Sequence, residues 1–219
     1  MRYLLTTVIA AHICGNLMVE LKFLRLHLLM LRELRLSSPP ESELEQYIGP
    51  PLQENVASLL GPNDPAKIAK GIELYREHFA LKGVYQSTIY PGINTTLKTL
   101  HQNSAKLFVA TSKPLTYTNR ILDHFELRTF FSGIYGAELD GTRAKKGELI
   151  GYLLQNESLR PEESCMVGDR SHDIIGALEN HITAIGALWG YGSYEELTAV
   201  GANVLCESPS DLIQIFQRF

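Results

Sequence analysis

Apolar and polar positions divide the chain into a helical block and a longer region in which strands and helices alternate. In the first block apolar residues recur at the spacing of a helix face, and Pro, Gly and Ser separate the segments. The pattern predicts helices at Leu17–Leu36, Glu41–Tyr47, Leu52–Leu60 and Pro65–Lys82. No segment here alternates as a strand would, so we expect the block to be all-helical.

A different rhythm begins after Tyr90-Pro91-Gly92, where short apolar runs alternate with helical segments. Strands are predicted at Lys106–Thr111, near Ile134, at Ser164–Val167 and at Ile182–Leu188, and helices up to Leu100 and at Pro114–His124, Lys146–Gln155 and Asp173–Asn180. Such alternation indicates βαβ units and a parallel sheet that binds ligands at the carboxyl ends of its strands. We therefore predict an α/β fold: a Rossmann-like parallel-sheet core of residues 1–14 and 86–219, with residues 15–85 inserted as a helical cap.

The composition is that of a globular chain, because 45% of its 219 residues are apolar and the net charge is -4. Lys and Arg are scattered among Asp and Glu, without the basic stripe that a nucleic-acid backbone requires, so we expect no nucleic-acid partner. Polar residues interrupt the apolar N-terminal stretch too often for a membrane span. Cys14, Cys165 and Cys206 lack disulfide or metal-ligand spacing, which is typical of reduced thiols and predicts a cytoplasmic location.

The strongest chemical pattern is Cys165–Asp173, an apolar strand that ends in Gly-Asp and is followed by a second aspartate. Asp169 would emerge at the carboxyl edge of the sheet and Asp173 at the start of the next helix. Paired carboxylates at such an edge suit Mg²⁺, which also takes waters and substrate phosphate as ligands. By itself the pattern favours a turn closed by Asp169 and a helix capped by Asp173 over a metal site.

A second pattern places the hydroxyls of Thr111 and Ser112 at the end of a strand, just before a helix that starts near Pro114. Backbone N–H groups at a helix start bind phosphate oxygens, and the hydroxyl of Thr111 can add another donor. Alone, the pattern is also that of an ordinary helix cap, with Lys113 as a solvated charge.

A third pattern is the polar loop Asp140–Lys145, which leads into an apolar helix that begins with Lys146. An ammonium group there could neutralise charge on a phosphoryl group. A lysine at a helix start is usually just exposed, although the helix dipole slightly disfavours it there, which favours a functional interpretation.

Together, in this order and on these strands, the three patterns resemble motifs two, three and four of the haloacid dehalogenase-like (HAD) phosphatases. The resemblance is to their phosphoglycolate phosphatase-like branch, through Tyr47–Leu52, Tyr90–Gly92 and Leu188–Ser193, and it extends from about Leu31 to the C-terminus. It implies a HAD core with a cap, a small phosphorylated metabolite as substrate, and hydrolysis of a phosphomonoester through an aspartyl-phosphate. The implied residues are Thr111 and Lys146 as catalytic groups, Thr111, Ser112 and Lys146 as phosphate ligands, and Asp169 and Asp173 as ligands of Mg²⁺, with Lys145 as the alternative motif-three lysine.

The chain departs from this family at motif one, where an apolar strand should end in Asp-x-Asp-Gly-Thr. Its first aspartate is Asp64. Matching Tyr3–Leu5 to the family's strand puts Thr7 at the nucleophile position and Ile9 at the acid/base position. Ile9 supplies no base to activate a threonine, so we expect turnover to be impaired.

Two hypotheses explain this departure. A pair of compensating frameshifts, in the gene or in its reading, could have replaced residues 6–30, in which case the segment should pack poorly for its apolar content. Alternatively, the chain is an evolved pseudophosphatase that binds a metabolite or a protein. The sequence leaves the substrate open, and a monomer and a homodimer fit it equally.

Overall fold

The computed structural model describes residues 7–10, 20–40, 43, 47, 50–81 and 89–218. The chain divides into two compact units, Met1–Gly15 with Ile89–Phe219, and Asn16–Thr88. We call the first the sheet unit and the second the helical unit. The sheet unit is therefore assembled from two parts of the chain, with the helical unit between them in sequence.

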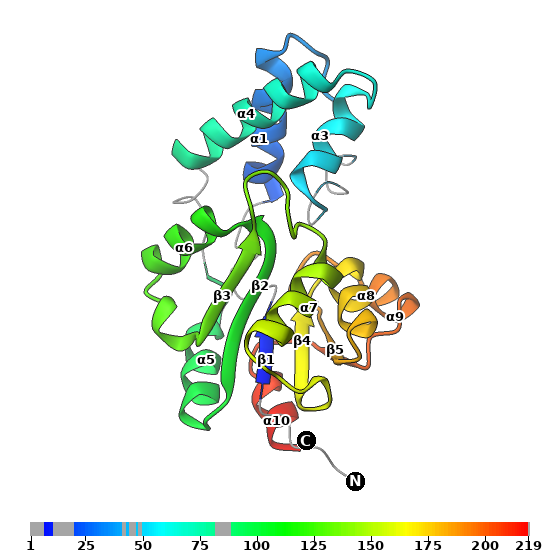
Figure 1. Cartoon of the computed structure of the whole chain (residues 1–219). Helices are drawn as coiled ribbons and strands as arrows, with labels where there is room; N and C mark the ends of the chain where they lie inside the picture. Colours follow the sequence, from blue (N-terminus) through cyan, green and yellow to red (C-terminus); the bar gives the residue numbers. More distant parts are fainter. Residues whose placement is uncertain are drawn as a thin grey trace. The chain divides into compact units, whose positions relative to one another are not determined.

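The sheet unit is built on six parallel strands, in the order β3-β2-β1-β4-β5-β6 (Figure 1). They are β1 (Thr7–Ala10), β2 (Lys106–Pro114), β3 (Gly133–Ala137), β4 (Ser164–Gly168), β5 (Thr183–Ala187) and β6 (Val204–Cys206). The described side chains of the two central strands, β1 and β4, are buried, which is why both strands contain consecutive apolar residues rather than an alternation of apolar and polar ones. An α/β fold with a parallel sheet, as predicted, is confirmed.

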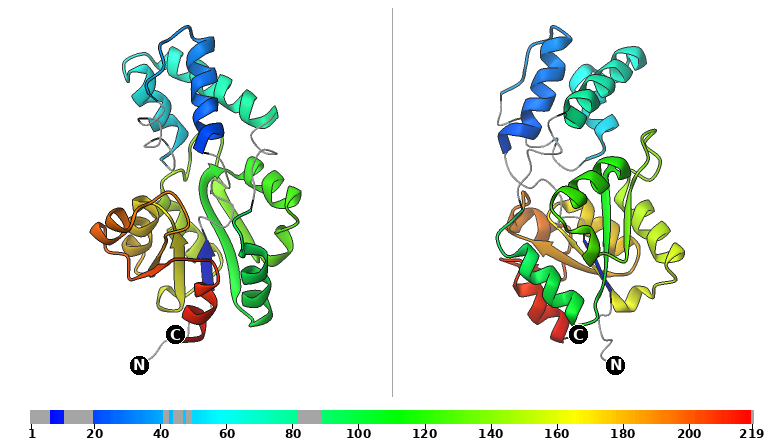
Figure 2. Two further views of the ribbon diagram at one scale, coloured as in Figure 1. Left: turned by 180° about the vertical axis from the view of Figure 1, so that it is seen from behind. Right: turned by 90° about the vertical axis from the view of Figure 1, so that its left-hand side faces the viewer.

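Helices cover both faces of this sheet (Figure 2). In chain order they are α5 (Ile93–Gln102), α6 (Leu115–His124), α7 (Lys146–Asn156), α8 (Ser171–Glu179), α9 (Tyr194–Ala199) and α10 (Asp211–Arg218), with short 3-10 turns at Arg128–Phe130 and Pro161–Glu163. Helices α7 and α8 pack together on one face, and α5 and α10 pack together on the other. The core under α7 and α8 contains Phe108, Leu153, Met166 and Ile174, all fully buried.

The helical unit contains α1 (Glu20–Glu33), α3 (Leu52–Leu60) and α4 (Pro65–Leu81). Helix α4 packs against α1 and α3, and its Gly71 lets side chains of Val56, Leu60 and Met30 approach its backbone closely. Met30, Leu31 and Val56 are nearly or fully buried. This unit thus has an apolar core of its own, as expected for a unit that packs independently.

The N-terminal strand lies further along the chain than the sequence suggested. We expected the strand at Tyr3–Leu5, but β1 covers Thr7–Ala10. The prediction that residues 6–30 pack poorly is wrong for the described part, since Val8, Ala10, Leu26 and Met30 are buried. Residues 11–19 lie outside the described residues, as does most of the helix expected at Glu41–Tyr47.

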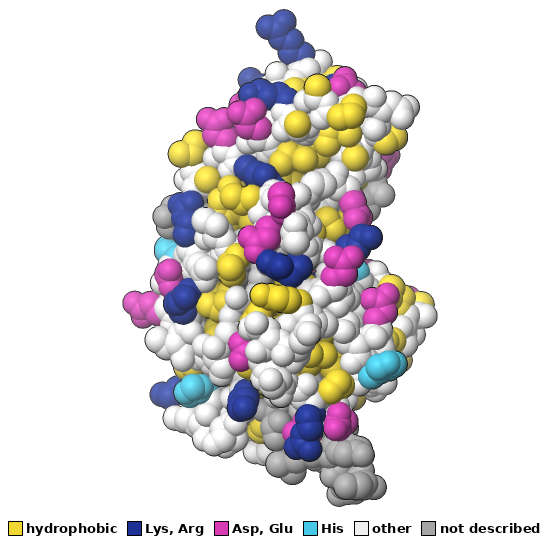
Figure 3. Space-filling model, viewed as in Figure 1, with side chains coloured by type: hydrophobic (Ala, Val, Ile, Leu, Met, Phe, Trp, Pro, Cys, Tyr) yellow, Lys and Arg dark blue, Asp and Glu magenta, His cyan; other side chains and the backbone are white. Residues whose placement is uncertain are grey.

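The surface carries charges of both signs. On the face drawn in Figure 3, Lys and Arg side chains lie among Asp and Glu side chains, as their scatter along the sequence suggests. Within the described ranges, no helix is long and apolar enough to cross a membrane.

Candidate active site

The order of the strands marks one place on the sheet as the natural site for a ligand. The chain direction across the sheet reverses between β1 and β4, and open α/β sheets bind ligands at the carboxyl ends of the strands beside such a reversal. Strand β4 ends at Gly168, directly before Asp169, and β2 reaches Thr111 two strands away. The motifs predicted from the sequence are therefore gathered at this edge.

Lys146 links helix α7, strand β2 and helix α8 through its ammonium group. It lies in the first turn of α7, yet it is buried, and its Nζ donates to the carbonyl oxygen of Ala110, 2.9 Å away. The same Nζ lies 3.1 Å from Oδ1 of Asp173, forming an ion pair in which both side chains are about 5% exposed. Lys145 is exposed instead. Of the two candidate lysines, the structure thus brings Lys146 to the other motifs.

Asp173 organises the turn after β4. Its Oδ2 accepts hydrogen bonds from the backbone N–H groups of Asp169 and Arg170, each at 3.2 Å. With Oδ1 paired to Lys146, both oxygens of this carboxylate are engaged. The alternative interpretation of Asp173 as a helix-capping residue is therefore also correct, because it caps α8 from the third position of the helix.

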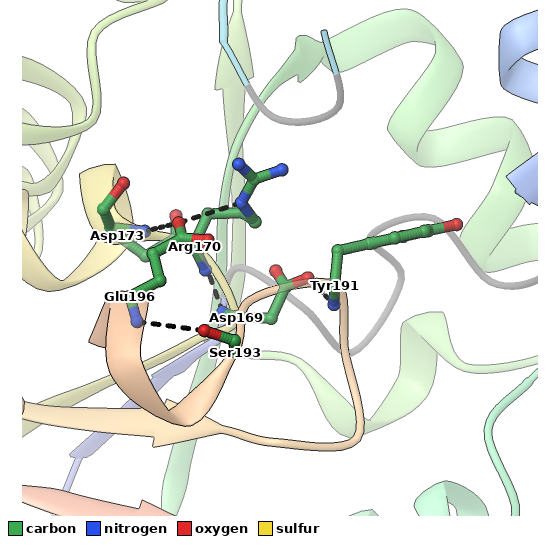
Figure 4. A network of polar contacts seen from close by, with 7 residues as sticks. Asp169, Arg170, Asp173, Tyr191, Ser193 and Glu196 are labelled. Atoms are coloured by element: carbon green, nitrogen blue, oxygen red, sulfur yellow. Dashed lines mark hydrogen bonds and ion pairs between the residues drawn. The ribbon is translucent and has the colours of Figure 1, made fainter. Parts of the chain in front are cut away.

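Asp169 is buried at the tip of β4, and the loop after β5 surrounds it. Its Oδ2 accepts a hydrogen bond from the N–H of Tyr191 at 2.9 Å (Figure 4). A Cβ atom at Gly190 would collide with the side chain of Asp169, and one at Gly192 would collide with its carbonyl oxygen. Only glycine allows this loop to come so close to the carboxylate.

Thr111 and Ser112 lie where β2 loses its regular pairing with β3. The register shifts between Thr111 and Pro114, which opens the strand just before α6. Oγ1 of Thr111 accepts a hydrogen bond from the N–H of Lys113 at 3.2 Å, and both hydroxyl residues are partly exposed. This widened strand end presents hydroxyl groups beside the carbonyl of Ala110 that Lys146 binds.

His172 adds an imidazole to the same turn. Burial lowers its pKa, an effect that the carboxylate of Asp173 partly offsets and the nearby ammonium of Lys146 reinforces. The lowered pKa favours the neutral form of the imidazole.

The match of Thr7 to the nucleophile position is wrong. Thr7 pairs with Lys106 and Ser164, the first residues of β2 and β4, so it lies at the amino end of the sheet and is buried there. The last described residue of β1, Ala10, pairs with Val109 and Val167, two residues before Thr111 and Asp169. Two residues after Ala10 in the sequence comes His12, outside the described residues.

Sequence reasoning missed Tyr191 and Glu196. Tyr191 acts through its backbone N–H, which any residue but proline would supply, although the flanking Gly190 and Gly192 hint at close packing. Glu196 binds the turn after Asp169 from α9, a helix that we did not predict. Nowhere in the described ranges do three or more His, Cys, Asp or Glu side chains form a cluster fit to hold a metal ion.

Comparison with known proteins gives this site a family context. The family model for haloacid dehalogenase-like hydrolases matches residues 23–187. A 5'-nucleotidase of Pseudomonas aeruginosa is 38% identical over 187 residues, which are 85% of this chain and 84% of that protein. A phosphoglycolate phosphatase of Vibrio parahaemolyticus is 26% identical over 147 residues, 67% of this chain and 64% of that protein.

Solved structures support the same assignment over the whole chain. The crystal structure of a predicted phosphatase from Clostridium acetobutylicum superimposes with a TM-score of 0.90 and 31% identity, covering 99% of this chain and 100% of that one. The family model matches well over half of the chain, and phosphatases recur among its relatives. The resemblance seen in the sequence is therefore confirmed, and the chain belongs to the haloacid dehalogenase-like hydrolase family.

Proposed function

We propose that this chain carries the pocket of a Mg²⁺-dependent phosphomonoesterase whose turnover is strongly reduced by the lack of an aspartate at motif one. The observation that carries the proposal is the position of Lys146 Nζ, 2.9 Å from the carbonyl oxygen of Ala110 and 3.1 Å from Asp173 Oδ1. One buried cation thereby connects β2 with helix α8, which follows β4, beside the reversal of strand order.

The carboxylates at this edge fit a magnesium ion. Mg²⁺ prefers carboxylate, water and phosphate oxygens, and Asp169 and Asp173 provide carboxylates on the same turn. Asp169 is the better direct ligand, because Lys146 and two backbone N–H groups already engage both oxygens of Asp173. When bound there, the ion would supply positive charge to the phosphate oxygens of a substrate.

The chain's own residues would do the rest of the binding. The ammonium of Lys146 is buried, so its charge would act on a nearby phosphate more strongly than it would in water. The hydroxyls of Thr111 and Ser112 lie at the opened end of β2 as further donors to phosphate oxygens.

We infer a small phosphorylated metabolite as the substrate. Nucleoside monophosphates and phosphoglycolate are the first two classes to test, because relatives carry the names 5'-nucleotidase and phosphoglycolate phosphatase. The helical unit remains the proposed cap.

The register of β1 supports a choice of where to introduce an aspartate. Counting two residues on from Ala10 reaches His12, the sequence equivalent of Thr111 and Asp169, and Cys14 comes two residues later with Gly15 directly after it. His12-Ile13-Cys14-Gly15 thus matches the spacing of the family's Asp-x-Asp-Gly. The variant to build carries His12→Asp with Cys14→Asp, rather than substitutions at Thr7 and Ile9.

The test is Mg²⁺-dependent hydrolysis of p-nitrophenyl phosphate by the chain and by this double variant. We expect very low activity in the chain and a gain of at least about 10²-fold in the variant, the lower limit for one positioned acid/base group. Asp169→Asn in the same background is the control and should remove the gain.

A folded double variant without activity would contradict the proposal. In that case the chain would be better described as a binding module, and the affinity of the chain for inorganic phosphate would become the decisive measurement. Residual Mg²⁺-dependent activity of the unaltered chain that survives Asp169→Asn would contradict it equally, because the proposed site would not be its source.

A further inference from the structure

Glu196 connects the turn after β4 to helix α9. Its Oε1 accepts two hydrogen bonds, one from the backbone N–H of Ser171 at 2.8 Å and one from Nε of Arg170 at 3.0 Å. Its own N–H donates to Oγ of Ser193 at 3.1 Å, which fixes Glu196 at the start of the helix. We call Glu196, Arg170 and Ser171 the Glu196 bridge.

The Glu196 bridge belongs to a chain segment that holds Asp169 from a second side. Tyr191, five residues before Glu196, donates its N–H to Asp169 Oδ2, and Gly190 and Gly192 pack against the same residue. Figure 4 shows the loop of Tyr191 and Ser193 passing beside Asp169 while Glu196 reaches the turn at Arg170. One continuous segment therefore contacts Asp169 through Tyr191 and the turn that follows Asp169 through Glu196.

The Glu196 bridge also pairs the positive charge of Arg170 with a carboxylate. Arg170 comes directly after Asp169 in the sequence, and Figure 4 draws its guanidinium at the same turn as the carboxylate that would hold Mg²⁺. The ion pair with Glu196 is largely shielded, since the two side chains are 18% and 26% exposed. It neutralises the guanidinium and fixes its Nε on the side of α9.

We propose that Glu196 is a positioning residue for Asp169. By pairing with the guanidinium of Arg170, Glu196 keeps it from competing with a divalent cation for the carboxylate of Asp169. This inference rests on the proposed function, because it assigns Asp169 to the cation. It differs from a purely structural role for Glu196 by predicting a change in metal affinity in a chain that remains folded. Contacts of this kind around a metal ligand typically change metal affinity by about 10–100-fold when they are removed.

The experiment uses Mn²⁺ as the probe, with free Mn²⁺ measured by electron paramagnetic resonance in the presence of the full-length chain. Asp169→Asn defines the site, because binding there should be lost in that variant. We expect Glu196→Ala to weaken Asp169-dependent binding about 10-fold. Glu196→Gln should have a smaller effect, because an amide oxygen can still accept the N–H of Ser171 but no longer neutralises Arg170. The same set in the His12→Asp, Cys14→Asp background adds the activity readout.

Glu195→Ala is the matched control. Glu195 has the same charge and lies in the same first turn of α9, but its carboxylate interacts with Ser193 rather than with the turn after β4. Its removal should leave Mn²⁺ affinity within about twofold of the unaltered chain, well below the change expected at Glu196. Should Glu196→Ala fail to fold, as judged by its melting temperature, Glu196→Gln carries the test.

Unchanged Mn²⁺ affinity in folded Glu196 variants would overturn the positioning role and leave the proposed function intact. By contrast, the complete absence of Asp169-dependent Mn²⁺ binding, in the chain and in the restored background alike, would overturn both. Weakened binding in Glu196→Ala that Arg170→Ala restores would support the competition between the guanidinium and the cation.

Discussion

Strands β1 and β4 are neighbours at the centre of the sheet, but they lead into loops of different chemistry. Both are short, parallel and buried, and residues along β1 pair in register with β4 from Thr7 to Ala10. Strand β4 continues into Asp169 and a turn held by a carboxylate, a lysine and three backbone N–H groups. The sequence after β1 contains no acidic residue before Glu20. The packing of each strand thus depends on its own buried residues, whereas the chemistry depends on the residues that come after the strand.

The largest effect should come from placing a charge at the wrong end of β1. Thr7→Asp puts a carboxylate at a position that is 2% exposed and lies beside the first residues of β2 and β4. We expect a loss of about 3–5 kcal/mol in the free energy of unfolding, as for other uncompensated buried charges. Urea denaturation measures it, with Thr7→Val as the control of similar volume. A stable Thr7→Asp would show that β1 has another register.

The next largest effect should come from the carboxyl edge beside β4. Lys146→Met leaves the buried carboxylate of Asp173 without its cation, although two backbone N–H groups still bind it. We expect a loss of about 3 kcal/mol, at the lower end for a broken buried pair. Lys145→Met, at the exposed neighbour, should change stability by less than about 0.5 kcal/mol. Equal losses for the two lysines would contradict the buried ion pair.

Two matched valines compare the packing of the strands directly. Val8 in β1 and Val167 in β4 are 3% and 1% exposed. Val8→Ala and Val167→Ala each remove two methyl groups from the core and should each cost about 2 kcal/mol, from lost transfer energy and a small cavity. Chemical denaturation of both variants sharpens the comparison. A loss at Val167 alone would mean that β1 contributes little to the core.

The sequence predicted most strands of the sheet because each is an apolar run bounded by turn residues. It failed where that signal is weak. The stretch from Tyr3 to Ile13 is mostly apolar and shows no clear alternation, so periodicity cannot fix the strand's position, and pairing with β2 and β4 selects Thr7–Ala10 instead. Strand β6 has three residues, too few for any pattern to show.

The residues of the candidate site also fall into those that the sequence predicts and those that it does not. Asp169, Asp173 and Lys146 could be named because carboxylates and a lysine at strand ends carry a chemical pattern in the sequence. Their partners could not be named, since Tyr191 contributes a backbone N–H and Glu196 lies 23 residues after Asp173 in the sequence. Contacts of these kinds depend on how the loops fold back, which a single sequence does not encode locally.

The smallest effect should be a change in acid stability at Glu196. Burial alone would raise the pKa of its carboxyl group, but hydrogen bonds from Ser171 and Arg170 outweigh burial and hold the pKa below its usual value of 4.5. Because the pKa is lower in the folded chain, this contribution is present above pH 4.5 and is lost as the pH falls below it.

Glu196→Gln should therefore flatten the loss of stability on the acid side. Thermal unfolding of both chains between neutral pH and about pH 3 provides the measurement. The two curves should differ at neutral pH and converge in acid. Curves that stay parallel throughout would show that Glu196 contributes nothing through its charge.

The buried pair of Lys146 and Asp173 has a consequence for how such a chain can change over generations. Once a catalytic aspartate is lost, selection for turnover no longer protects the pocket, yet either partner of this pair can be replaced alone only at a large cost in stability. Drift would therefore remove the exposed groups first and leave the lysine and the aspartate in place. An intact pair at this edge therefore reflects what the fold needs for stability, and by itself it does not report catalytic activity.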